Sequence, residues 1–244
     1  MRWGEPKKER ECARAAADMG NCMSSRPKKV ASRADYIQYM ARTGDFWLFS
    51  SNSLEIKCFT GSPYTHIGQI LVLDPAIFGG SGVYLWHSMP PGDHYPLDLL
   101  SSPPRRKEGS QLNDVREVLK RWGDVPVDVR RIRFKEGSSH PWLSEEPIAT
   151  APLIRFMRRE HVKPYETNFA EFVKSAYDGP GGQNEEDTSE YFCSELVAET
   201  YKRFGVMNTP QPSNEFVPGD FSSDRDYCCG FRSNIRFKGE LRIV

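Results

Sequence analysis

The stretch THIGQILVL, residues 65–73, has the apolar and β-branched character of a strand. Asp74-Pro75 and the sequence GGSG at residues 79–82 then mark a turn, and residues 83–88 (VYLWHS) form a second apolar run. Because so short a connection brings consecutive strands side by side, the two runs are predicted to pair antiparallel. Helical patterns occur elsewhere in the chain, so the predicted fold class is α+β.

The rest of the chain supplies both kinds of element. An aromatic run at 46–49 (FWLF) predicts a strand, and residues 166–177 carry apolar side chains at helical spacing. Gly205 stands where a helix covering residues 191–204 would end. Further helices are expected at residues 34–41, 115–122 and 148–159, and further strands at residues 125–134 and 234–244. Residues 101–110 are expected to form a polar loop.

Composition narrows the function classes. The chain of 244 residues carries 33 basic and 33 acidic side chains, so it has no net charge to attract nucleic acid or an anionic membrane. No run approaches the roughly 20 apolar residues that span a bilayer. We therefore expect neither a nucleic-acid partner nor a transmembrane segment.

The N-terminal residues and the cysteines bear on organisation and location. Residues 1–32 are basic and lack apolar periodicity, which predicts a flexible N-terminal segment ahead of one catalytic domain at 33–244. Charges stand where a signal peptide would need an apolar region. The six cysteines have no disulfide-framework spacing, and the adjacent pair Cys228-Cys229 is given no role. A reducing compartment, the cytoplasm, is predicted.

The candidate nucleophile lies in the sequence YFCSELV, residues 191–197. Cys193 would occupy the first turn of a helix, where unpaired amides and the helix dipole favour a thiolate. The same amides could donate to an oxyanion. A free cysteine is nevertheless most often a small buried apolar residue. Position alone therefore does not separate a catalytic from a structural cysteine.

A thiol nucleophile needs an imidazole base, and that base needs a group to orient it. His66 begins the first quoted strand and His87 stands near the end of the second. In an antiparallel pair these two side chains would be neighbours, as base and orienter. A metal site built from both histidines and Cys193 is a weaker alternative, since no local spacing supports it and no metal is predicted.

At these residues the chain resembles the circularly permuted, NlpC-type papain-like amidases, the YaeF/YiiX group. The resemblance covers about residues 42–224, with gaps, and its most specific piece is YFCSELV. The other matching pieces are Gly44-Asp45, SPYTHIG at 62–68, KPYE at 163–166 and VPGDF at 217–221. It implies a papain-like antiparallel sheet packed against the helix that carries the nucleophile, with the histidine strand preceding the cysteine helix.

The resemblance also implies residue roles. Cys193 would be the nucleophile and His66 the base, while Tyr165, together with Tyr64, would be a candidate for oxyanion or substrate binding. Many relatives carry a glutamate followed by serine as the third polar residue. This chain has His87-Ser88 there, which leaves either residue as the orienter.

The predicted function is thus a cysteine amidase or peptidase that cleaves amide or ester bonds through a thioester, without a cofactor. Its substrate would be a small amide, a peptide or a lipid conjugate. Two alternatives stay open: a lipid or aminoacyl transferase that uses the same thioester, and an inactive papain-like module that binds without turnover.

Overall fold

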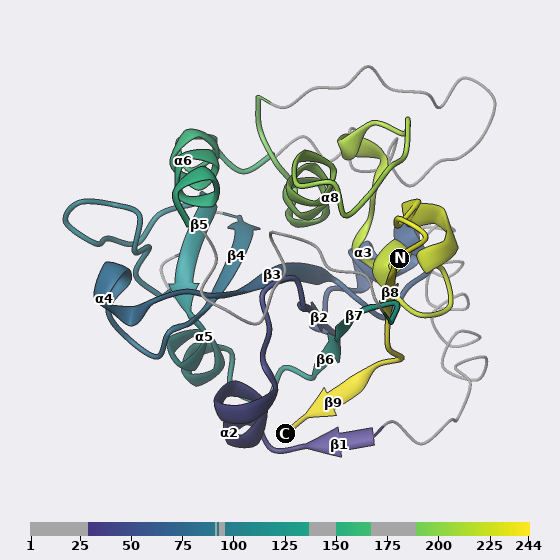
Figure 1. Ribbon diagram of the computed structural model, residues 1–244, viewed down its shortest axis with the longest axis horizontal. Helices are drawn as coiled ribbons and strands as arrows, with labels where there is room; N and C mark the ends of the chain where they lie inside the picture. The colour runs from purple at the N-terminus through teal and green to yellow at the C-terminus, as the bar shows by residue number, and fades with distance from the viewer. Residues whose placement is uncertain (1–28, 91, 93–95, 137–149, 167–188) are drawn as a thin grey trace, which may run out of the picture.

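A computed structural model describes residues 29–90, 92, 96–136, 150–166 and 189–244. Its centre is a seven-stranded sheet with the order β1-β9-β6-β2-β3-β4-β5 (Figure 1). Neighbouring strands are antiparallel, except that β1 runs parallel to β9. The strands of this sheet are β1 (Lys29–Ala31), β2 (Phe46–Phe49), β3 (His66–Val72), β4 (Val83–Met89), β5 (Gly109–Asp114), β6 (Val127–Arg130) and β9 (Leu241–Ile243).

A separate two-stranded sheet joins β7 (Ile132–Phe134) to β8 (Ile235–Phe237). The helices are α2 (Arg33–Asp35), the π-helix η1 (Tyr36–Met40), α3 (Leu54–Thr60), α4 (Pro75–Phe78), α5 (Val115–Trp122), α6 (Thr150–Glu160) and α8 (Cys193–Arg203), with short 3-10 helices at η2 (Ser213–Glu215), η3 (Pro218–Phe221) and η4 (Asp226–Cys229). No helix within these described residues is long and apolar enough to cross a bilayer.

The large sheet is covered on both faces, and each face has its own apolar core. Helices α6 and α8 lie on one side of the sheet, and α5 and α2 lie on the other (Figure 1). Side chains alternate between the faces along a strand. Ile67 and Leu71 of β3 accordingly pack in the core of the α8 face, whereas Ile70 of the same strand packs in the core of the α5 face.

Most predicted elements are confirmed. The antiparallel pairing of residues 66–72 with 83–89 is as expected, with Ile70 opposite Leu85. The mixed α+β class and its mostly antiparallel sheet are confirmed as well. The helices expected at 115–122, 148–159 and 191–204 appear as α5, α6 and α8, although residues 148–149 are not described. The helix expected at 166–177 lies almost entirely outside the described residues.

Several boundaries differ from expectation. The single strands expected at 125–134 and 234–244 are each divided, because β6 and β9 join the large sheet while β7 and β8 pair with each other. The helix expected at 34–41 is a short α-helix followed by a π-helical turn. Residues 29–31, placed in the flexible N-terminal segment, form β1 against β9, and residues 1–28 of that segment lie outside the description. The last two residues of the expected polar loop, 109 and 110, belong to strand β5.

Candidate functional site

Cys193 is the first residue of α8, as predicted. Phe192, which precedes it, is extended, and its amide donates to the Glu195 carboxylate at 2.8 Å. An acidic side chain three positions into a helix often satisfies an amide at its start in this way. Leu196, Val197 and Tyr201 are fully buried against the sheet. The sulfur is therefore carried by a helix that is anchored over its length.

The segment before Cys193 is held by its own contacts. The Ser88 hydroxyl donates to the main-chain oxygen of Tyr191 at 2.8 Å, and the Tyr191 hydroxyl donates to Glu160 at 2.9 Å. Lys163 donates to the same hydroxyl at 2.9 Å. These contacts fix the start of α8 to β4 and to the end of α6. Ser88, the alternative orienter, is thus engaged in holding the main chain next to Cys193.

The Cys193 thiol is enclosed, with only 5% of the residue exposed. Burial raises the pKa of the Cys193 thiol to about 12, although main-chain groups of Ile67 and Ser194 act in the opposite direction by hydrogen bonding. The neighbouring Glu195 carboxylate raises this pKa further. At neutral pH the sulfur in this arrangement is a protonated thiol, and the start of the helix does not by itself make it a thiolate.

The predicted histidine pair is present. Nε2 of His66 and Nδ1 of His87 are 2.9 Å apart, and Nε2 of His87 is 2.6 Å from Oδ1 of Asn113. Asn113 in turn donates through Nδ2 to the main-chain oxygen of Leu97 at 2.9 Å, which identifies Oδ1 as an acceptor. His87 therefore donates from Nε2 and accepts at Nδ1. His66 then donates from Nε2, which leaves its Nδ1 as the unprotonated nitrogen.

Both imidazoles are neutral. Burial lowers the pKa of His87 to about 4, even though the bond to Asn113 acts in the opposite direction. Burial, with a smaller contribution from His87, holds the pKa of His66 well below its ordinary value. The His66 ring also packs against Phe49 and Trp122, with ring centroids 5.4 and 5.1 Å away. Three aromatic rings, counting that of His87, thus surround it.

The histidine pair and the thiol occupy opposite faces of the sheet. His66 and His87 share the α5 face with Asn113, since His66 packs against Phe49 and Trp122 of that core. Cys193 lies in the core of the α8 face, which also holds Ile67. No hydrogen bond or ion pair within the described residues joins Cys193 to either histidine. Of the three residues that were expected to converge, only His66 and His87 lie together.

Gly68 explains why the two histidines fit side by side. A Cβ atom on Gly68 would lie 2.7 Å from Cδ1 of Leu85 and 3.0 Å from Cβ of His87. Both distances are closer than ordinary contact, so a larger residue would displace the strand that carries His87. The glycine thus leaves room on the α5 face for the imidazole pair.

The two predicted tyrosines occupy different surroundings. The Tyr64 hydroxyl donates to Asp128 at 3.0 Å, and Arg242 donates to both oxygens of that carboxylate at 2.6 and 2.9 Å. Its hydroxyl is thereby part of a buried network on β6 and β9. Tyr165 instead packs edge-on against Phe192, with ring centroids 5.7 Å apart, and therefore lies beside the start of α8.

Asp45, part of the Gly44-Asp45 piece, is more than a turn residue. It is fully buried, and its carboxylate accepts from the Tyr36 hydroxyl at 2.8 Å and from the Ile132 amide at 2.8 Å. Burial raises the pKa of this carboxyl to about 6, against the effect of these hydrogen bonds. Through these hydrogen bonds Asp45 links η1 to β7, and it has no role in the proposed chemistry of the thiol.

Sequence reasoning missed Asn113 and Trp122. Asn113 lies on β5, which was not predicted, and Trp122 was noted only as the end of a helix. Within the described residues no three possible metal ligands gather at one point, and the set proposed for the weaker metal alternative is split between the two faces. No protein-family model and no curated protein matches the chain.

Proposed function

We propose that the protein is a thiol hydrolase with a circularly permuted papain-like fold, in which Cys193 attacks an amide or ester carbonyl and His66 serves as the base. The observation that carries the proposal is the packing of the start of α8 on β3, where Cys193 shares a core with Ile67 and the Ile67 main chain acts to lower the pKa of the thiol. Because Ile67 directly follows His66, the sulfur lies beside the strand that presents the histidine. The order of histidine strand and cysteine helix agrees with the permuted arrangement.

The proposal requires a rearrangement. The reaction needs the His66 ring within hydrogen-bonding reach of the sulfur, and in the described conformation that ring lies on the α5 face. His66 is the first residue of β3, so the change concerns one end of the strand and leaves the rest of β3 in place. Because the backbone fixes the face to which a strand residue points, the main chain at His66 must turn toward α8, which would break the bond to His87 and form the ion pair with Cys193.

The chemistry then follows from these groups. Transfer of the thiol proton to His66 yields a thiolate, which forms a bond to the carbonyl carbon of the substrate. The amide groups at the start of α8 face the developing oxyanion. Collapse of this intermediate expels the amine or alcohol, which takes the proton from His66. Water then hydrolyses the thioester and regenerates the thiol, whereas an amine or alcohol acceptor would make the protein a transferase.

Alkylation of the thiol tests this function without knowledge of the substrate. Iodoacetamide labelling, followed by mass spectrometry across pH 5.5 to 9, is expected to modify Cys193 with a midpoint within this range, because the rearranged conformation supplies a thiolate although burial raises the pKa of the thiol to about 12 in the described one. The variant His66→Gln should move that midpoint upward. Cys229→Ala is the matched control, because Cys229 is a second buried free thiol among the described residues and plays no part in the proposal.

Turnover is the second readout. A panel of activated acyl esters and acyl amides should be cleaved by the native protein and not by Cys193→Ala, with Cys229→Ala retaining full activity. Cleavage that persists in Cys193→Ala would remove the cysteine from the mechanism.

A second function is favoured by the same geometry. The buried, protonated thiol and the histidines on the other face suit an inactive papain-like module that binds its ligand without turnover. For such a module, labelling of Cys193 would be negligible at pH 7 and unaffected by His66→Gln. That result would reject the hydrolase proposal and support the binding module.

A further inference from the structure

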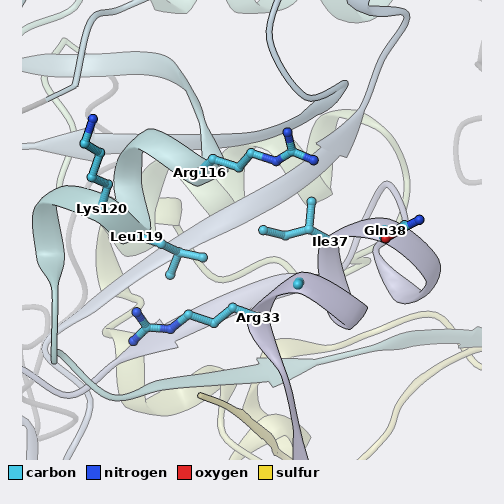
Figure 2. A pocket seen from close by; sticks show the side chains of 7 residues that line it. Arg33, Ile37, Gln38, Arg116, Leu119 and Lys120 are labelled. Atoms are coloured by element: carbon cyan, nitrogen blue, oxygen red, sulfur yellow. The ribbon is translucent and has the colours of Figure 1, made fainter.

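A hollow on the α5 side of the molecule is unused by the proposed function. It has a volume of about 460 Å³ and opens between α5 and the segment formed by α2 and η1 (Figure 2). Because α5 packs on the face of the sheet opposite Cys193, the hollow is separated from the thiol by the sheet itself. Its size lies within the range of roughly 300 to 1,000 Å³ that small-ligand sites occupy.

The wall of the hollow is basic. Arg33 comes from α2, and Arg116 and Lys120 come from successive turns of α5. Figure 2 shows the Arg116 side chain extending across Ile37 toward η1. No carboxylate contributes to the lining, and none of the described residues forms an ion pair with these three cations. Figure 2 shows the charged ends of Arg116 and Lys120 pointing in opposite directions, so the α5 wall of the hollow carries a cation at each end.

Arg33 adds a donor that the protein leaves unused. Its Nη2 donates to the main-chain oxygen of Gly123 at 2.9 Å, which holds the side chain along the base of the hollow. Its Nε is buried and has no hydrogen-bond partner. Buried guanidinium donors are normally satisfied. The Arg33 guanidinium is thus a fixed positive charge at the hollow with one donor unsatisfied.

The floor of the hollow is apolar. Leu119 and Ile37 belong to the core of the α5 face or pack against it, and Ala34 is exposed at the edge. An apolar floor makes no favourable contact with an inorganic anion, whereas it stabilises an alkyl chain by removing it from water. The volume is too small for a helix of a partner protein, whose diameter with side chains is about 10 Å or more.

We propose that this hollow binds a free single-chain amphiphile with a carboxylate head group, of the medium-chain fatty-acid type. The head group pairs with Arg116, whose side chain extends over Ile37, and the chain covers Ile37 and Leu119. Neither Cys193 nor the histidine pair takes part, so the site stands independently of the proposed hydrolase.

The test uses the full chain and calorimetric titration with decanoate below its micelle-forming concentration. Decanoate is expected to bind with one site per chain. Acetate, which keeps only the head group, and decyltrimethylammonium, which keeps only the chain and reverses the charge, should each bind about tenfold more weakly or worse. Equal binding of all three would overturn the proposal, as would the absence of decanoate binding.

Variants locate the ligand. The double variant Arg116→Glu and Lys120→Glu should weaken decanoate binding by about tenfold or more, since it replaces two attractions by repulsions. Ala34→Phe, at an exposed position, should fill the hollow and abolish binding without a change of charge. Arg121→Glu is the matched control, because Arg121 is an exposed cation of the same helix outside the lining.

Two further outcomes distinguish a specific fatty-acid site from general charge attraction and from a membrane contact. Arg121→Glu changes the net charge by half as much as the double variant, so if it produces half or more of the loss in binding free energy, the effect is one of overall charge and the site is rejected. If vesicles of an anionic phospholipid bind while decanoate does not, the basic face is a membrane contact and the proposal also fails. Binding of decanoate by Cys193→Ala should equal that of the native protein, so failure of the hydrolase proposal leaves this one intact.

Discussion

The two faces of the large sheet divide the chemistry of the protein between them. The α8 face holds a thiol that burial keeps protonated, whereas the α5 face holds two imidazoles that burial keeps neutral. Each group is therefore in its uncharged form for the same physical reason, which is removal from water. Separately, neither face has the means to create a reactive ion. The proposed reaction depends on moving one side chain from one face toward the other.

Trp122→Ala should have the largest effect on this division. Trp122 packs edge-on against Phe49, with centroids 4.5 Å apart, and against His66. Loss of a partly buried indole should reduce the free energy of unfolding by about 3 kcal/mol, as measured by urea denaturation. If Trp122 holds His66 on the α5 face, labelling of Cys193 at pH 7 should also become faster.

The conservative variant Trp122→Phe keeps a ring beside His66 and serves as the control. Faster labelling in Trp122→Ala but not in Trp122→Phe would tie the thiol to the position of the imidazole. A drop in stability without any change in labelling would indicate that the ring of Trp122 is structural only.

Acid should destabilise the α5 face next most strongly. The pKa of His87 is lowered to about 4, so below pH 6.5 the unfolded chain binds a proton that the folded protein does not. Stability therefore falls as the pH falls from about 6.5 to about 4, with a slope approaching about 1.4 kcal/mol per pH unit for this residue.

Replacing His87 should remove the contribution of this residue to the pH dependence of stability. Denaturation of His87→Gln between pH 4 and 7 is expected to show a shallower pH dependence than the native protein. Parallel curves would mean that His87 is already exposed to protons in the folded state.

Gly68→Ala should have a moderate effect, and only on the α5 face. The added methyl group would press on Leu85 and on His87, with an expected cost of about 1 to 2 kcal/mol. Two-dimensional NMR of the imidazole nitrogens should show loss of the His66–His87 hydrogen bond. Unchanged imidazole signals would place the strain elsewhere.

Cys193→Ala should give the smallest change in the pH dependence of stability, and this change is confined to alkaline pH. Burial raises the pKa of the thiol from 9.0 to about 12, so the unfolded chain loses this proton first as the pH rises. The native protein should lose about 1 kcal/mol of stability between pH 9 and 10 through this group. The alanine variant should not, and denaturation at both pH values measures the difference.

Much of the fold could be predicted because its signals are local. The turn at residues 79–82 and the apolar runs on either side of it determine the β3–β4 pair, and Gly205 marks the end of α8. Strand β5 was missed because the sequence GSQLND has little β-branched or aromatic character. Its place in the sheet comes from cross-strand partners on β4, such as Leu112 opposite Trp86.

The site was predicted only in part for a related reason. Antiparallel pairing of the two strands was enough to bring His66 beside His87. Whether Cys193 meets them depends on which face α8 covers, and along β3 that face alternates at every residue. The side chains of Ile67 and His66 therefore point to opposite cores, and no pattern in the sequence says which core the helix joins.

The parallel pair β1–β9 has a consequence for how the chain folds. Ala31 lies opposite Ile243, and the amide of Arg33 donates to the main-chain oxygen of Val244 at 2.9 Å. Strands from the two extremes of the described chain thus complete one border of the sheet, and closing so long a loop is slow. Until β9 is in place, β6 exposes an unpaired edge on which other chains could add. Fast renaturation at high protein concentration should therefore favour aggregates, and dilution should favour the native sheet.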